Sequence, residues 1–176
     1  MKPRILSLLI SILSISILFT ACKKEGSVSQ DYSAETAAHS EDQSRFSAEV
    51  DAVANDANLA LEVTPAFSGR GGEIQALICD ADITVDTLAN PRTITITYNG
   101  TNCLGNRTRT GVIVLSMAQG VRWKNAGAAL SVSYQNFKVT RVSDNKSITI
   151  NGSQTYTNVS GGLLINLPVL GTITHT

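Results

Sequence analysis

Histidine is scarce in this sequence, and its scarcity restricts the chemistry that the chain can carry. The 176 residues include two His: His39 lies in a polar stretch and His175 is the second-last residue. A Ser–His–Asp triad needs a His held between a nucleophile and a carboxylate. We expect neither His to be fixed by packing, so we predict no His-dependent active site and no catalytic residue.

Motifs for metals and nucleotides are missing as well. No pair of Cys or His has the spacing of zinc ligands. The glycine-containing stretch 100–111 lacks the Gly-Lys-Ser/Thr ending of a phosphate-binding loop. We therefore predict no metal and no cofactor.

The sequence also has no excess of charge. Lys and Arg number 14, as do Asp and Glu, so the formal net charge is zero. A basic excess is the usual electrostatic footprint of a nucleic-acid-binding protein. We therefore expect no nucleic acid as a partner.

The N-terminal apolar run is short for a membrane span. Residues 5–19 are apolar or Ser, and about 15 residues fall short of the roughly 20 that a bilayer needs. Lys2 and Arg4 precede this run, and a small residue and a Cys follow it. This order is typical of a secretory signal peptide; the alternative is a short transmembrane or core helix.

The end of this run resembles the lipobox of bacterial lipoproteins. In Phe19-Thr20-Ala21-Cys22, Phe19 departs from the usual Leu. The resemblance implies cleavage before Cys22 and lipidation of Cys22, with more than one acyl chain because a single chain anchors only marginally. Residues 23–25, Lys-Lys-Glu, are similar to the starts of Bacteroidota lipoproteins, some of which carry such residues as a surface-export signal. The implied location is the cell envelope, at the surface or periplasmic face of the outer membrane, with the membrane as partner through the anchor.

Composition then divides the rest of the chain. Removing residues 1–21 leaves 176 − 21 = 155 residues, which is room for one ordinary domain. Residues 22–40 are rich in Ser, Ala, Glu and Gln and predict a flexible tether. Residues 41–176 are predicted to form a single β-rich domain that begins with a helix.

That helix is predicted over residues 41–62. Ser40 and Gln43 have the spacing of a capping box. Apolar residues follow at helical steps and predict one buried stripe; they are Phe46, Val50, Val53, Ala57 and Ala60. We expect the stripe to pack against the domain; the alternative is pairing with another protein.

Beyond residue 73 the apolar period becomes that of strands. Ile94, Ile96 and Tyr98 alternate with Thr, and Asn99-Gly100 predicts a hairpin turn. Residues 112–117 are almost continuously apolar, as in a strand covered on both faces.

The second half of the domain continues this pattern with interruptions. Apolar parity changes between residues 134 and 137, which predicts a bulge near Gln135-Asn136. Asn151-Gly152 is expected to separate two strands. The alternation in 172–176 predicts a last strand, which either closes the sheet or leads into a longer parent. Together these features predict an antiparallel sandwich or barrel-like sheet of about six to eight strands.

Two groups of residues are candidates for a site. Asp80, Asp82 and Asp86 share strand parity, and such a row could bind calcium or supply a glycosidase-like acid and base; the alternative is a solvated strand face. A second group could form a patch in which an aromatic ring stacks on a sugar and Arg binds an anion. Its members are Arg107, Arg109, Arg122, Trp123 and Lys124. The alternative for these cations is protection of an edge strand from aggregation.

Cys79 and Cys103 remain once Cys22 carries lipid. In an oxidising compartment an even pair predicts a disulfide; the alternative is two buried free thiols. We therefore predict a lipid-anchored cell-envelope protein of structural or binding role, without catalysis. The alternatives are a carbohydrate-active enzyme that uses Asp80 and Asp82, and a glycan-binding module that uses Trp123.

Overall fold

The computed structural model describes residues 32–68 and 78–176. The chain divides into two compact units, Met1–Asp42 and Gln43–Thr176. The predicted signal peptide, Cys22, the export signal at 23–25 and the first part of the tether lie outside the described residues. The sheet, the core and the candidate site all belong to the second unit.

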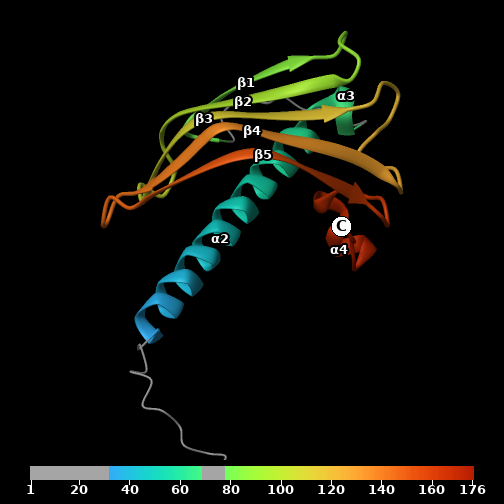
Figure 1. Cartoon of the computed structure of the whole chain (residues 1–176). Helices are drawn as coiled ribbons and strands as arrows, with labels where there is room; N and C mark the ends of the chain where they lie inside the picture. The colour runs from blue at the N-terminus through green and yellow to red at the C-terminus, as the bar shows by residue number, and fades with distance from the viewer. Residues whose placement is uncertain (1–31, 69–77) are drawn as a thin grey trace, which may run out of the picture. The chain divides into compact units, whose positions relative to one another are not determined.

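The described elements are two helices, five strands and a short helical C-terminal segment (Figure 1). They are α2 (Ser33–Val63), α3 (Pro65–Ser68), β1 (Ala81–Asp86), β2 (Arg92–Thr101), β3 (Arg107–Met117), β4 (Ala128–Arg141), β5 (Ser147–Asn158), η1 (Leu164–Asn166) and α4 (Leu167–Leu170). No helix in the described ranges is long and apolar enough to cross a membrane.

The strands form one antiparallel sheet in the order β1-β2-β3-β4-β5, so each strand pairs with its neighbour in sequence. This confirms the predicted mainly β fold with a preceding helix. The sheet is not closed into a barrel, and its five strands are fewer than the six to eight expected. One reason is that Asn151-Gly152 does not end a strand. Gly152 has a φ of 123° and pairs with Tyr134, and β5 continues through it.

The predicted bulge near Gln135-Asn136 is confirmed. From Tyr134 to Phe137 strand β4 advances three residues while its partner β5 advances two, from Gly152 to Ile150. The register with β3 shifts at the same place. Asn136 sits there with a φ of 49°, a left-handed conformation that Asn adopts more readily than most residues. The extra residue returns the apolar side chains of β4 to the core face.

The predicted turn at Asn99-Gly100 is wrong, because both residues belong to β2. The turn between β2 and β3 comes later, at residues 102–106. There the side-chain oxygen of Asn102 accepts hydrogen bonds from the backbone N–H groups of Asn106 and Arg107, each at 3.1 Å. A side chain that satisfies the backbone of its own loop favours a turn at that position.

Helix α2 begins at Ser33, eight residues before the predicted start at 41. Residues 33–40 of the predicted tether are therefore helical, and Ser40 with Gln43 lies inside the helix instead of capping it. The segment contains three Ala and one Glu, which have high helix propensity. Glu35 in the first turn also suits the positive end of the helix dipole.

The core lies between α2 and one face of the sheet. The predicted apolar stripe is confirmed for Val53, Ala57 and Ala60, which are buried. Phe46 is 46 % exposed, so the buried part of the helix begins later than predicted. At residues 112–117 of β3 the buried residues alternate with half-buried ones. The expectation that these residues are covered on both faces is therefore wrong, and only one face packs into the core.

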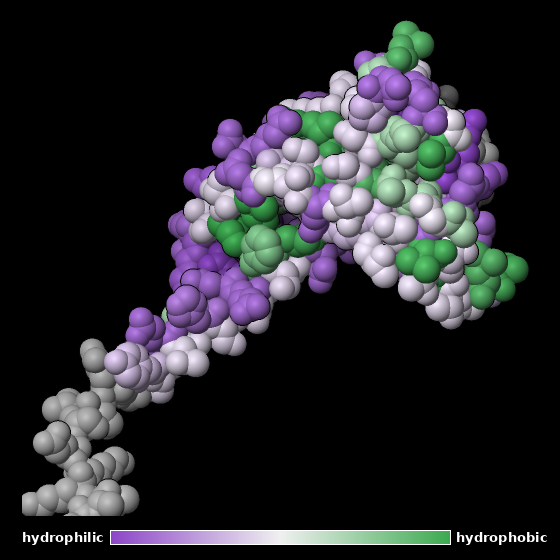
Figure 2. All heavy atoms as spheres, turned by 45° about the vertical axis from the view of Figure 1, so that its right-hand side comes forward, coloured by the Kyte–Doolittle hydropathy of each residue, from purple (hydrophilic) through white to green (hydrophobic). Residues whose placement is uncertain are grey.

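The C-terminal segment adds a short pairing to the free edge of β5. His175 forms an antiparallel bridge with Asn158, and the backbones of Thr157 and Thr176 exchange hydrogen bonds of 2.7 and 3.0 Å. The predicted last strand is thus reduced to this bridge. Before it, η1 and α4 expose apolar side chains (Figure 2); they include Leu164, Ile165, Leu167, Val169 and Leu170.

Candidate functional site

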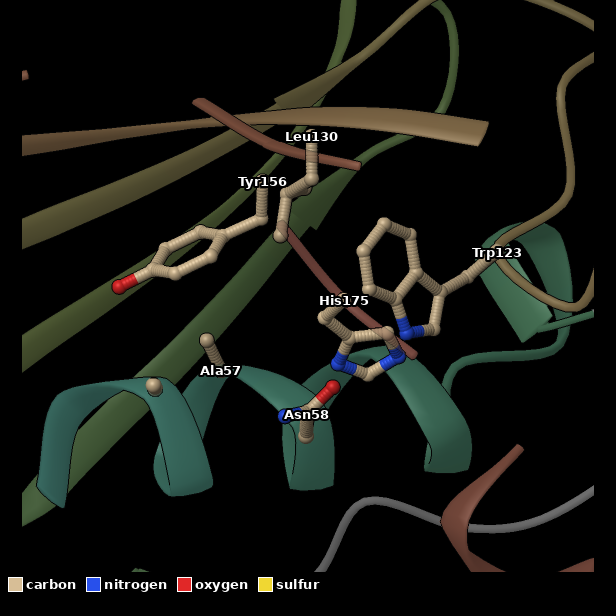
Figure 3. A pocket seen from close by; sticks show the side chains of 7 residues that line it. Ala57, Asn58, Trp123, Leu130, Tyr156 and His175 are labelled. Carbon is tan, nitrogen blue, oxygen red and sulfur yellow. The ribbon is translucent and has the colours of Figure 1, made fainter. Parts of the chain in front are cut away.

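A pocket lies between α2 and the β4–β5 side of the sheet (Figure 3). Its volume is about 190 Å³. The walls come from the helix, two strands, the β3–β4 connection and the C-terminal segment. The lining residues are Ala54, Ala57, Asn58, Trp123, Leu130, Tyr156 and His175.

The helix and the strands place the first part of this wall. Ala54, Ala57 and Asn58 are three and four residues apart, so they share one face of α2. Leu130 of β4 and Tyr156 of β5 are direct cross-strand partners, and their side chains therefore lie on the same face of the sheet. The two Ala leave space beneath these larger side chains.

Backbone hydrogen bonds position Trp123, which lies in the β3–β4 connection. Its N–H donates to the carbonyl oxygen of Phe67 at 2.8 Å. Its carbonyl oxygen accepts a hydrogen bond of 2.8 Å from the side chain of Asn158. Trp123 is only 2 % exposed. It is a rigid wall of the pocket and not a surface aromatic.

His175 is held in place by packing, contrary to the expectation for a second-last residue. Its backbone bridges to Asn158, and its ring centroid lies 5.1 Å from that of Trp123. Nε2 is buried and has no hydrogen-bond partner among the described residues. Burial lowers the pKa of His175, and the nearby charge of Glu62 opposes this effect in part. The imidazole is therefore neutral at neutral pH.

Tyr156 closes the pocket on the side of β5. The side-chain amide of Gln154 donates to the hydroxyl oxygens of Tyr156 and Tyr134. Burial raises the pKa of both phenols, so they stay protonated. In Figure 3 the hydroxyl of Tyr156 points away from His175, and the ring itself faces the pocket.

The predicted row of carboxylates is not assembled. Asp80 lies in the turn before β1 and is 3 % exposed, whereas Asp82 and Asp86 lie on the exposed face of β1. Asp82 accepts a hydrogen bond from the side chain of Asn99 at 3.0 Å. Asp86 accepts bonds from the two N–H groups of residues 88 and 89. Strand parity failed here because Asp80 precedes the regular strand.

Asp80 instead belongs to a buried charged cluster. It accepts two hydrogen bonds from Arg109, at 2.7 and 2.5 Å. Asp56 of α2 accepts one from Arg109 at 2.7 Å and one from the hydroxyl of Tyr98 at 2.8 Å. Although burial of Arg109 works in the opposite direction, the hydrogen bond to Asp80 and the neighbouring charges raise the pKa of its guanidinium. Burial raises the pKa of the Tyr98 phenol.

The predicted ligand patch is not assembled either. Arg107 pairs with Glu49 at 2.6 Å and Arg109 is buried in the charged cluster. Arg122 follows the opposite end of β3, where it donates to the carbonyl oxygens of Pro65 and Ala66. Trp123 is buried, and of the five predicted residues Lys124 alone is exposed. Apart from Lys124, these side chains are engaged within the fold, and the structure does not bring the five together on one surface. Glycan binding stays a prediction.

The predicted disulfide is confirmed. Cys79 and Cys103 are bonded, with their Cα atoms 5.3 Å apart and a sequence separation of 24. The bond joins the turn before β1 to the turn between β2 and β3. It therefore fixes the segment that carries Asp80.

A second hollow of about 180 Å³ lies on the other side of α2. Its lining includes Glu49 and Ala52 of the helix, Leu104 of the β2–β3 turn, and Arg107. Within the described residues no group of three His, Cys, Asp or Glu side chains could hold a metal ion. Comparison of the chain with protein-family models, with curated proteins and with solved structures finds no match.

Proposed function

We propose that this protein is a lipid-anchored cell-envelope protein whose β-rich domain has a binding role. The anchor is the lipid on Cys22, and the location is the outer membrane. The binding role belongs to the pocket between α2 and the β4–β5 side of the sheet.

The single observation that carries the binding role is the composition of the pocket wall. Rigid aromatic and aliphatic side chains surround a space of about 190 Å³, and a small number of polar groups interrupt them. Small-molecule sites have this mixture, because apolar walls supply affinity and a few polar groups fix orientation.

The anchor is supported by the order of features in the first 25 residues. Two cations, a short apolar run and Ala21-Cys22 follow one another as in a lipoprotein signal. Lys23, Lys24 and Glu25 then agree with export to the cell surface.

The anchor is tested by replacing the acceptor thiol. Cys22→Ala should prevent both the lipidation and the cleavage, so the protein should lack the mass of the acyl chains and retain the mass of residues 1–21. Ser27→Ala is the matched control in the same stretch and should behave as the wild type. A Cys22→Ala protein with the same mass as the wild type, apart from the substituted side chain, would contradict the anchor.

A further inference from the structure

The polar groups of the pocket are gathered at one end. In Figure 3 the side chain of Asn58 points toward the imidazole of His175, and the indole of Trp123 lies on the other side of that ring. Nε2 of His175 is buried, and in Figure 3 one ring nitrogen of His175 lies on the side of Asn58; we take Nδ1 as the nitrogen that faces the ligand. The remaining walls, from Ala54, Ala57, Leu130 and the ring of Tyr156, are apolar at the surface that faces the space.

The lack of charged residues in the pocket wall restricts the charge of a ligand. The seven lining residues include no Asp, Glu, Lys or Arg. A charged group taken from water into such a place would lose its hydration without gaining a counter-charge. The occupant is therefore uncharged.

The size of the space limits the ligand as well. An apolar cavity of about 150 Å³ holds one benzene molecule, and this pocket has about 190 Å³. It accommodates one six-membered ring with a short substituent. A sugar ring has the right size, but it carries more hydroxyls than this wall can satisfy.

His175 and Asn58, at the polar end of the pocket, determine which substituent the ring of the ligand can carry. A neutral imidazole presents either a donor or an acceptor at Nδ1, and an amide presents both. A hydroxyl can donate and accept, so it satisfies either arrangement. We propose that the pocket binds a small uncharged ring compound with one hydroxyl group, whose ring lies against Trp123 and Tyr156 and whose hydroxyl bonds to His175 and Asn58. This inference rests on the binding role proposed above.

The pocket carries its own reporter. Trp123 is the single Trp of the chain, so fluorescence excited at the red edge of Trp absorption reports this site alone. Benzyl alcohol and toluene are the probes, because they share a ring and differ in the hydroxyl. The full chain would be titrated in lipid nanodiscs, where partitioning of the probes into lipid is the same for every variant.

Three variants separate the parts of the inference. Ala54→Leu fills the pocket and should weaken both probes by at least about tenfold, since a leucine side chain occupies the space of the ring. Ala52→Leu is the matched control, because it makes the same change on the same helix beside the other hollow. It should leave both affinities unchanged.

His175→Phe keeps a ring beside Trp123 and removes the nitrogen. It should weaken benzyl alcohol by about tenfold relative to toluene, which is the worth of one hydrogen bond to the hydroxyl. Equal weakening of both probes would overturn the assignment of the hydroxyl. A lack of saturable change in Trp123 fluorescence with either probe would overturn the site, as would equal effects of Ala52→Leu and Ala54→Leu.

A measurement on the wild-type chain tests the site without relying on variants, which could fail to fold. Nuclear Overhauser effects between the ring protons of benzyl alcohol and the indole protons of Trp123 should appear in the wild-type chain, and their absence would overturn the site. Binding is independent of the anchor. If Cys22→Ala shows no loss of lipid while benzyl alcohol binds as expected, the proposed anchor fails and the pocket stands.

Discussion

The two flanks of helix α2 meet the same sheet with opposite chemistry. The charged flank consists of Asp56, Tyr98, Asp80 and Arg109, and it faces β2 and β3. The pocket flank consists of the seven residues that line the pocket, and it faces β4 and β5. Asp56 and Ala57 are neighbours in sequence, yet the turn of the helix sends them to different flanks.

The charged flank holds helix and sheet together through ion pairs, whereas the pocket flank leaves a space between them. On the charged flank Arg109 bonds to both carboxylates, and Asp56 also accepts from Tyr98. A buried charge is tolerated only when it is paired and hydrogen-bonded. On the pocket flank the helix contributes Ala and Asn, and one imidazole nitrogen has no partner among the described residues.

Replacement of Arg109 should cause the largest loss of stability, because it removes the ion pairs of the charged flank. Arg109→Met leaves the carboxylate of Asp80 buried without a counter-charge, which should lower the free energy of unfolding by about 3–5 kcal/mol. Urea unfolding followed by Trp123 fluorescence measures it. Arg107→Met is the control: its side chain is 32 % exposed, and a partly exposed pair contributes about 1 kcal/mol or less.

A double variant sharpens this result. Arg109→Met with Asp80→Leu removes the orphaned charge together with its partner, so most of the lost stability should return. If the double variant is as unstable as the sum of both single variants, the cost comes from packing and not from an unpaired charge.

The disulfide should contribute the next largest effect; it lies beside the charged flank, because Cys79 directly precedes Asp80. Replacing Cys79 and Cys103 together by Ala frees a loop with a separation of 24 residues, and chain entropy puts the loss near 3 kcal/mol. The midpoint of urea unfolding measures this loss in the double variant and in the reduced wild type. Equal midpoints for the wild type with and without reductant would contradict it.

Of the two residue pairs behind these predictions, the sequence predicts the disulfide but not the ion pair between Arg109 and Asp80. The disulfide was predictable because only two thiols remained once Cys22 was set aside. Apolar parity revealed the inward face of β2 and even the bulge at Asn136, because both patterns lie within a few residues. Arg109 and Asp80 lie 29 residues apart, and nothing in the local pattern of either residue marks the other as its partner.

The pocket was missed for the same physical reason. Its seven residues come from five separate segments, and only the fold of the second unit brings them together. A residue close to the end of a sequence is not expected to be fixed by packing, so His175 is not among the predicted site residues. Its bridge to Asn158 is a long-range pairing without a turn signal. One signal was present: Ala54 and Ala57 are small residues at helical spacing, and small residues on a buried helix face leave space.

Protonation of His175 should give the smallest effect, and it should act on the pocket flank. Its pKa in the folded chain is lowered below the ordinary value of 6.5. As the pH falls, the unfolded chain therefore binds the proton first, and the stability that depends on the neutral imidazole is present above about pH 6.5 and lost below it. Glu62 is the charge that opposes this shift.

The measurement compares urea midpoints at about pH 7.5 and about pH 5.5, on either side of an ordinary His pKa. His175→Phe should lose less stability between these two conditions than the wild type does. A wild type and a variant with the same pH dependence would show that His175 titrates as it does in the unfolded chain.

The extra residue in β4 has a wider consequence than a local bend. Without it, Phe137 and Val139 would point to the outer side of the sheet while Tyr134 pointed inward, and the strand would divide its apolar side chains between water and core. A Cβ on Gly111 of the neighbouring strand β3 would lie 2.3 Å from the carbonyl oxygen of Asn136. Only a glycine at this position therefore allows the two backbones to approach so closely. The extra residue shifts the register of β4 against both β3 and β5. The extra residue therefore fixes the register of β4. If β4 slipped by one residue against either neighbour, the bulge would no longer face the positions that accommodate it, and both strand pairs would be misaligned.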